Sequence, residues 1–424
     1  MKLVNNKNKI FPTIINQQGT VIVYVGILIL VLIGIAALAV DIGHLYVARN
    51  ELQNAADAGA LAGARELYLA NGTLVNVGAN QVAYDTARAN NSQNLTVEVN
   101  WTPGANIDTD VERGHWSFAT RQFTHSDRTE PPQLWDYTTQ QLDDVTTFDP
   151  PFVNAVRVKT RRESTPVAMT FAGIFGFPTY PVTAEAIAYI GFAGSLAPHE
   201  VDQPIAICKE SLLINGKYSC SIGRMINSGG DDLNSETGGW TDFNQDNPCT
   251  GGTNATAVKN EVCGDGNDTP LLPQPIATSG GEIQSAFDDL ILCWINKTGK
   301  TVPWELTLPV ITCPGNNITT CETVVGAVTI NIVWITGGGE DPHYNDAPLK
   351  MGDWSSSDPD GSVRWNSFVS HFSLQNVDGS PAPYNKKSIY FKPDCAPHEL
   401  AGGTGGQNFG ILAKRPKLVA PPQN

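Results

Sequence analysis

Eight cysteines are the side chains of this 424-residue chain best suited to covalent cross-linking. None of them forms a C-x-x-C motif, and the gaps between near neighbours fit no zinc pattern. An even number of cysteines, all after residue 200, instead predicts disulfides formed in an oxidising compartment. The candidates are Cys208, Cys220, Cys249, Cys263, Cys293, Cys313, Cys321 and Cys395.

The connectivity of these disulfides is left open by the sequence, because eight cysteines allow many alternative pairings. Pairing between near neighbours is the simplest hypothesis. It would join Cys208 to Cys220, Cys249 to Cys263 and Cys313 to Cys321.

Two glycine-containing segments resemble phosphate-binding loops but lack part of the pattern. Gly299-Lys300-Thr301 ends like such a loop, yet Trp294 stands where the phosphate cradle needs glycine. The segment GGTGGQNFG at 402–410 lacks the third glycine of a dinucleotide loop and predicts a flexible turn. Neither segment predicts a cofactor site.

Three acidic segments offer oxygen ligands in the wrong context for a metal ion. Asp353-x-Ser355-x-Ser357 has the D-x-S-x-S form of a metal site, but a buried strand should precede it and PLKMG does so instead. The others lack the full spacing of a calcium loop and predict solvated turns; they are Asp358 with Asp360, and Asp265 with Asn267 and Asp268. With no G-x-S-x-G elbow either, we predict no enzyme, no metal, no cofactor and no small-molecule substrate.

An uncharged apolar run near the N-terminus would set where the rest of the chain lies relative to a membrane. The run, VIVYVGILILVLIGIAALAV at 21–40, would span roughly 30 Å as a helix, which matches the hydrocarbon core of a bilayer. Lysines precede the run and Asp41 follows it, so the positive-inside rule predicts a single-pass anchor in the bacterial inner membrane. Residues 1–20 would then be cytoplasmic and the bulk of the chain periplasmic.

Two other interpretations of the apolar run stay open. Ala37-Leu38-Ala39 is an A-x-A site, so the run could belong to a cleaved signal peptide, although it is longer than the usual signal core. A buried helix of a soluble protein is the third possibility, but such a helix seldom lacks charge over so long a stretch.

Small residues recur at every fourth position after the apolar run. Ala55, Gly59 and Gly63 form one line on a helix, and Ala56, Ala60 and Ala64 form the next, so another backbone can approach closely. We call these six residues the small-residue face. Either a helix of another protein or an element of the same domain could cover it.

The remaining patterns predict an α+β architecture. We expect the helix to run from the apolar segment to Ala70 and to end at Asn71-Gly72, with further helices at 74–89 and 166–176. Alternation of apolar residues predicts strands at 95–101, around Trp116, from 155 and at 182–188, with a loop at 126–151. The long helix would then cover a small mixed sheet.

A second, β-rich domain follows in this interpretation. The polar segment 195–204 predicts a linker between an α+β region at 41–194 and a cysteine-containing domain at 205–424. Within that domain we expect strands near 204–208, 305–311, 324–336 and 409–413, and a helix near 282–294. The net charge of −15 argues against a nucleic-acid partner.

The N-terminal residues resemble the signature of the Tad (tight adherence, Flp pilus) assembly proteins of the TadE/TadG type. The resemblance covers GIAALAVDIGHLYVARNELQNAADAGALAGA and continues more loosely to about residue 193. It implies a bitopic protein of a bacterial pilus or secretion apparatus, with other pilus proteins as partners. Prepilin-like members are cut after a glycine and carry Glu at the fifth mature position, but Tyr24 stands at that distance after Gly19.

Three functions remain open at this point. The resemblance favours a structural or assembly component of a Tad-type pilus that acts through protein–protein contacts. A surface adhesion or ligand-binding module is the alternative, since long Asn/Thr/Gly loops could supply contacts. An anchored periplasmic enzyme is the weakest, because no catalytic constellation appears.

Overall fold

The computed structural model describes most of the chain. The described residues are 18–69, 72–131, 134–214, 217–220, 223–227, 237–246, 249, 251–280, 283–314, 318–337, 346–376, 379–385 and 387–419.

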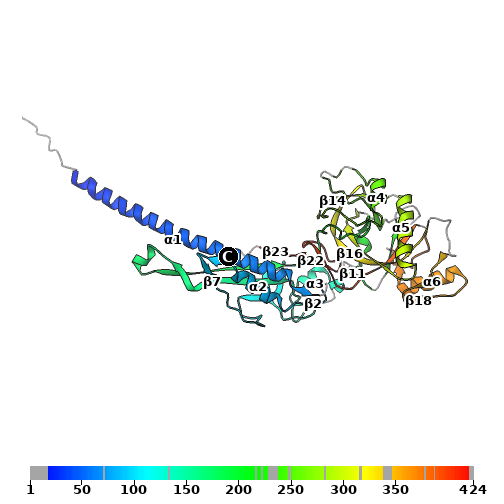
Figure 1. Cartoon of the computed structure of the whole chain (residues 1–424), viewed down its shortest axis with the longest axis horizontal. Helices are drawn as coiled ribbons and strands as arrows, with labels where there is room; N and C mark the ends of the chain where they lie inside the picture. The colour runs from blue at the N-terminus through cyan, green and yellow to red at the C-terminus, as the bar shows by residue number, and fades with distance from the viewer. Residues whose placement is uncertain are drawn as a thin grey trace, which may run out of the picture.

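One continuous helix, α1 (Gln18–Arg65), contains both the apolar run and the small-residue face. Its first half projects away from the rest of the chain, and its second half packs on the sheet and on α2 (Figure 1). The helix ends before the predicted Ala70, which lies outside the described residues, because its last turn tightens and the chain enters β1 (Tyr68–Leu69). β1 pairs with β2 (Leu74–Val75), so α2 (Ala79–Arg88) also begins later than predicted.

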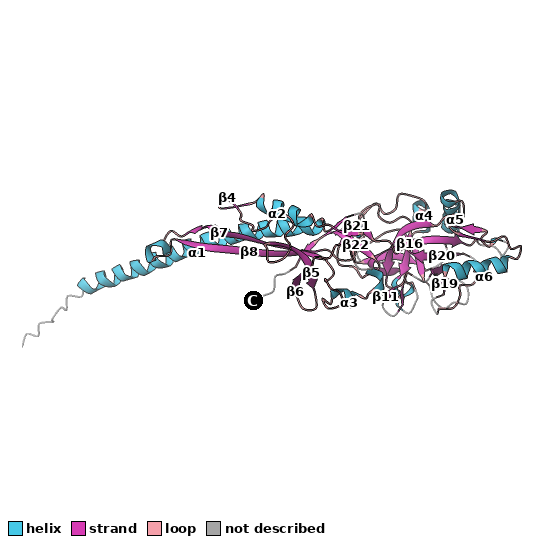
Figure 2. Cartoon of the chain, turned by 90° about the horizontal axis from the view of Figure 1, so that it is seen from below, coloured by secondary structure: helices cyan, strands magenta, loops and turns pink. Residues whose placement is uncertain are grey.

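A five-stranded antiparallel sheet lies against α1, in the order β23-β8-β7-β5-β6. The strands are β5 (Val111–Ser117), β6 (Gln122–His125), β7 (Ala155–Ala168), β8 (Thr179–Tyr189) and β23 (Lys417–Leu418). β7 and β8 form a long hairpin beside α1 (Figure 2). The edge strand β23 comes from the C-terminal end of the chain, so the first and last parts of the sequence share one sheet.

The predicted helix at 166–176 is wrong. Residues up to Ala168 belong to β7, and only a short 3₁₀ turn, η3 (Ala172–Phe175), is helical. β-Branched Thr165 and Val167 flank Pro166, which cannot donate a helical hydrogen bond, and Gly176 adopts φ of +93°. These residues favour a strand and a turn over a helix.

The other connections of the first part contain short elements. β3 (Asn91–Ser92) and β4 (Leu95–Thr96) form a small hairpin where we expected a strand over 95–101. The predicted loop at 126–151 contains η2 (Leu134–Asp136) and α3 (Thr139–Asp143). A capping box between Thr138 and Gln141 starts α3, because each side chain accepts a hydrogen bond from the other residue's backbone N–H.

The segment 195–204 is a packed junction and not an open linker. Leu196 and Val201 are buried, and Leu196 pairs with Leu271 in an isolated bridge. The buried Asn267 accepts a hydrogen bond from the N–H of Val201 and donates one to the carbonyl of Ala197. The segment is therefore packed against the second part of the chain.

The second part is built on an eight-stranded sheet in the order β14-β13-β9-β15-β16-β20-β12-β19. β14 also pairs with β16, so five of these strands close into a ring. The strands are β9 (Ile205–Cys208), β12 (Gly223–Asn227), β13 (Gly238–Thr241), β14 (Pro275–Ser279), β15 (Trp304–Ile311), β16 (Cys321–Ile335), β19 (Leu374–Gln375) and β20 (Ser388–Pro393).

Helices and smaller strand pairs surround this sheet. The helices are α4 (Ala255–Glu261), α5 (Gln284–Thr298), α6 (Gly361–Phe372) and the 3₁₀ turn η4 (Lys209–Ser211). The pairs are β10 (Leu213–Ile214) with β11 (Lys217–Tyr218), β17 (Lys350–Met351) with β18 (Trp354–Ser355), and β21 (His398–Gly403) with β22 (Ile411–Arg415). The predicted α+β fold, with a long helix over a small sheet and a β-rich disulfide-containing part, is confirmed.

Candidate membrane anchor and assembly surface

The apolar half of α1 is exposed along its whole length. Among residues 21–40 only Ala37 is half-buried. Large side chains such as Ile22 and Leu30 are exposed. Among the described residues, α1 is the helix long and apolar enough to cross a membrane. A core helix of a soluble protein would be covered, so its exposure disfavours that interpretation.

The small-residue face is covered by the chain itself. Its four alanines are fully buried. A Cβ on Gly59 would lie 2.8 Å from the carbonyl oxygen of Ala83, and one on Gly63 would lie 2.7 Å from the Cβ of Ala83. The close approach predicted from the sequence is present, but α2 and β7 supply it. A helix of another protein could take this face only if α2 moved away from it, so the intermolecular contact stays a prediction.

Asp41 holds the end of the β7–β8 hairpin against α1. Its side chain is 2% exposed, and its carboxylate accepts backbone N–H groups of Thr170 at 2.8 Å, Phe171 at 3.0 Å and Ala172 at 2.6 Å. Burial alone would raise the pKa of Asp41, but these donors to the charged form outweigh it and lower the pKa. The carboxylate is thus a cap for the hairpin end.

A second carboxylate braces the same hairpin further from its end. Glu98 accepts the backbone N–H groups of Glu163, Ser164 and Thr165, where the register between β7 and β8 shifts. Although desolvation opposes it, this set of donors lowers the pKa of Glu98 to about 2. The hairpin is therefore held to the body of the chain at two levels.

Replacing Asp41 by Asn should release the hairpin end, because a neutral amide oxygen is a weaker acceptor for three N–H groups. We expect hydrogen exchange of residues 170–172 to quicken by about tenfold. Asp57→Asn on the same helix is the control, since Asp57 accepts from the Gln53 side chain. Because the pKa of Asp41 is lowered, its stabilisation is complete above the ordinary value near 3.8 and is lost as pH falls through the lowered value. Unchanged exchange in Asp41→Asn would contradict this role.

All eight cysteines form disulfides, as predicted, but the hypothesis of near-neighbour pairs is wrong. The bridges are Cys208–Cys313, Cys220–Cys395, Cys249–Cys321 and Cys263–Cys293. Parallel pairing of β9 with β15 aligns Cys208 with Ile311, which brings Cys208 and Cys313 to a Cα separation of 5.5 Å. For this bridge, strand pairing across a long stretch of sequence brings the two cysteines together.

The two glycine-containing segments that resemble phosphate-binding loops have structural roles. Gly299 ends α5 in a left-handed conformation, and the Lys300 ammonium lies 5.9 Å from the ring centre of Trp294. The segment 402–410 is a packed strap and not the flexible turn that we expected. A Cβ on Gly402 or Gly406 would overlap the backbone of Ser195 or Ala193, so glycine permits this close approach.

The acidic segments are likewise engaged within the chain. Asp360 accepts the Ser362 N–H at the start of α6, and Asp353 lies 3.1 Å from the His371 ring. Sequence reasoning missed one group among the described residues, Glu305 with Asp394 and His398, whose ligand atoms lie within 4.8 Å of one another. These three are distant in sequence. Asp394 is already hydrogen-bonded to His398 and to the Ala396 N–H, so two members of the cluster are engaged within the chain.

A cavity of about 250 Å³ lies between the first sheet and the strap. Its wall includes Phe118, Leu142, Phe152 and Phe192, together with Asp143. The Asp143 carboxylate accepts the N–H groups of Phe118 and Ala119 and the Ser117 hydroxyl, so its oxygens serve the fold. Asp143 is therefore already engaged in hydrogen bonds within the cavity wall.

Comparison with protein families gives two matches in the first part of the chain. A family described as putative Flp pilus-assembly TadE/G-like matches residues 19–66, and one described as putative Tad-like Flp pilus-assembly matches residues 62–188. No curated protein and no solved structure matches the chain. The matched residues include α1, α2 and nearly all of the β7–β8 hairpin, so the resemblance drawn from the N-terminal signature is confirmed.

Proposed function

We propose that this chain, whose residues 19–188 match the two Tad-type Flp pilus-assembly families, is a membrane-anchored structural or assembly component of a Tad-type pilus or related secretion apparatus. The family matches carry the proposal. The exposed apolar half of α1 supports the anchor, and the absence of a recognisable catalytic arrangement among the described residues favours action through protein–protein contacts.

The proposed topology places the N-terminus in the cytoplasm and the bulk of the chain in the periplasm. Lys2, Lys7 and Lys9 precede the apolar run, which favours this orientation in the inner membrane. Four disulfides support an oxidising compartment for the second part. We retain 1–20, 21–40, 41–194 and 205–424 as the proposed regions, with 195–204 as the packed junction between the last two.

A topology reporter tests the anchor. Alkaline phosphatase fused after residue 70 should be active, and green fluorescent protein fused at the same place should be dark, because the fusion point would lie outside the cytoplasm. Fusions placed before residue 21 should give the reverse result. A soluble, shortened product would select the cleaved signal peptide instead, and cytoplasmic activity after residue 70 would contradict the topology.

A second candidate function is adhesion or ligand binding by the disulfide-bonded part. The position of this part in the molecule favours such a function, because it lies at the end far from the apolar half of α1 (Figure 1). It lies outside both family matches, so its role could differ from that of the first part.

Deletion of the gene in its host separates the two candidates. An assembly component predicts loss of surface pili together with loss of attachment, both restored by the full chain. An adhesin predicts pili in normal number that no longer attach. Normal pili and normal attachment would contradict both.

A further inference from the structure

The end of the β7–β8 hairpin exposes a cluster of large apolar side chains. We call residues 171–180 the hairpin tip. Within it Ile174 is 77% exposed, Phe175 79%, Phe177 68% and Tyr180 57%. Outside the apolar run, exposed large apolar residues do not otherwise gather so densely along the described chain. A concentrated apolar patch of this kind marks a surface that meets another apolar phase or molecule.

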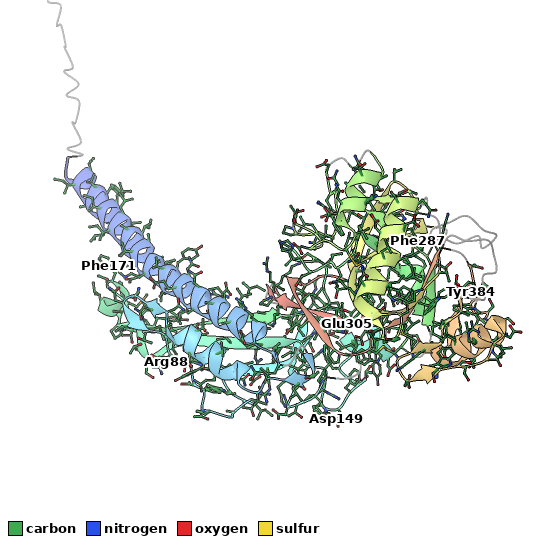
Figure 3. The ribbon with its side chains drawn as sticks, turned by 45° about the vertical axis from the view of Figure 1, so that its right-hand side comes forward. Arg88, Asp149, Phe171, Phe287, Glu305 and Tyr384 are labelled. Carbon is green, nitrogen blue, oxygen red and sulfur yellow. A yellow bond between two sulfur atoms is a disulfide. The ribbon has the colours of Figure 1, made fainter. Side chains whose placement is uncertain are left out.

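The position of the tip along α1 indicates which apolar surroundings it meets. The Thr160 hydroxyl of β7 donates to the carbonyl of Leu52, and ten residues later Thr170 donates to Asp41. β7 therefore runs antiparallel to α1 and brings the tip to the end of the apolar run. Phe171 lies at this end beside α1 (Figure 3). Ala37, one turn before Asp41 on the same face, is the half-buried residue of the run, and Ala172 of η3 donates its N–H to Asp41.

The composition of the tip suits a membrane interface. No residue between Ser164 and Ala184 is charged, whereas Glu163 and Glu185 lie immediately outside this stretch. Tyr180 offers an apolar ring with a polar hydroxyl, the kind of side chain enriched at headgroup level. A loop exposed only to water would be free to contain charged residues, so their absence over this length favours contact with a membrane.

Several backbone N–H groups at the tip are hydrogen-bonded within the chain, which suits a medium poor in water. Asp41 takes the N–H groups of Thr170, Phe171 and Ala172. The N–H groups of Ile174, Gly176 and Phe177 bond to carbonyls within the turn, and the N–H of Met169 bonds to the carbonyl of Pro178. Polar backbone groups satisfied in this way remove a main cost of entering the interfacial layer.

We propose that the hairpin tip inserts its apolar side chains into the outer face of the same bilayer that α1 crosses. This second contact would fix the rotation and tilt of the chain relative to the membrane, which a single helix leaves free. The inference rests on the membrane anchor of the proposed function and adds a lipid-binding surface to it.

Site-specific photo-crosslinking in the full chain tests this contact. A benzophenone amino acid replaces Phe175, and in a matched variant it replaces Phe118, which is also an exposed phenylalanine (52%) but lies in the turn between β5 and β6. Each variant is reconstituted into vesicles of phosphatidylethanolamine and phosphatidylglycerol and illuminated. We expect phospholipid adducts at position 175 to exceed those at 118 by about tenfold, because interfacial side chains lie among lipid headgroups.

Each result of this experiment decides the inference. Lipid adducts at 175 but not at 118 support it. Adducts at 175 to a second protein molecule, or equal lipid labelling at both positions, would overturn it and leave the anchor intact if the chain still sediments with the vesicles. Loss of sedimentation would defeat the anchor and the inference together. Since Phe175 is largely exposed, its replacement should not disturb folding, and unchanged thermal unfolding of the variant checks this.

Discussion

Reduction of the four disulfides should unfold most of the chain after residue 200. Three bridges join residues 105, 175 and 72 positions apart, and the fourth joins residues 30 apart. In the chain-entropy model each of the three long loops contributes about 4–5 kcal/mol, and the shorter one about 3.5 kcal/mol. Because an ordinary domain is stable by only about 5–15 kcal/mol, loss of all four should leave no folded second part.

The measurement is thermal unfolding of the purified full chain in detergent, with and without a phosphine reductant. No thiol should titrate before reduction, and eight should titrate afterwards. Removal of one bridge at a time gives the matched comparison. Cys208→Ala with Cys313→Ala should cost more than Cys263→Ala with Cys293→Ala, because the first pair closes the longer loop and both its sulfurs are buried. Titratable thiols in the oxidised protein, or melting unchanged by reduction, would contradict the expectation.

Elements marked by local patterns were predictable from the sequence. The uncharged run at 21–40 specifies a helix by itself, and alternating apolar residues after Ala155 specify a strand. The helix expected at 282–294 is present as α5, since its apolar face repeats at helical spacing. The predicted helix at 166–176 is wrong because its apolar residues serve a strand and an exposed turn, and composition alone does not separate these from a buried helix face.

Features that depend on pairing between distant residues could not be predicted from the sequence. The Cys208–Cys313 bridge depends on the pairing of β9 with β15, which are separated by about a hundred residues in the sequence. The return of residues 417–418 to the edge of the first sheet leaves no local signal. The segment 195–204 packs against the second part because Asn267, distant in sequence, bonds to the Val201 N–H and the Ala197 carbonyl.

The small-residue face shows the same division between local and long-range information. Glycine and alanine at every fourth position require that something approach closely, which is a local property of the helix. The identity of the neighbour depends on the turn that brings α2 back along α1. Gly59 and Gly63 therefore face Ala83 within the chain, and their substitution tests packing before it tests assembly.

Gly59→Leu combined with Gly63→Leu should destabilise the first part of the chain strongly. A leucine at 59 would meet the backbone of α2, which cannot yield like a flexible side chain, and one at 63 would also meet Val156 of β7. Overpacking of this kind costs about 1–3 kcal/mol at each site, so we expect roughly 2–6 kcal/mol for the pair. Unfolding of the purified chain and its steady-state abundance in the membrane measure the loss.

Gly43→Leu is the matched control on the same helix, because a Cβ there meets no atom within 4 Å and the helix gains a better helix-forming residue. It should leave stability unchanged or slightly raised. Full abundance and normal unfolding of the Gly59/Gly63 variant, with pili lost, would mean that α2 leaves this face when the apparatus assembles and that another molecule takes its place. Loss of abundance in that variant alone, with Gly43→Leu normal, would assign the face to the fold and direct the search for assembly contacts to other surfaces.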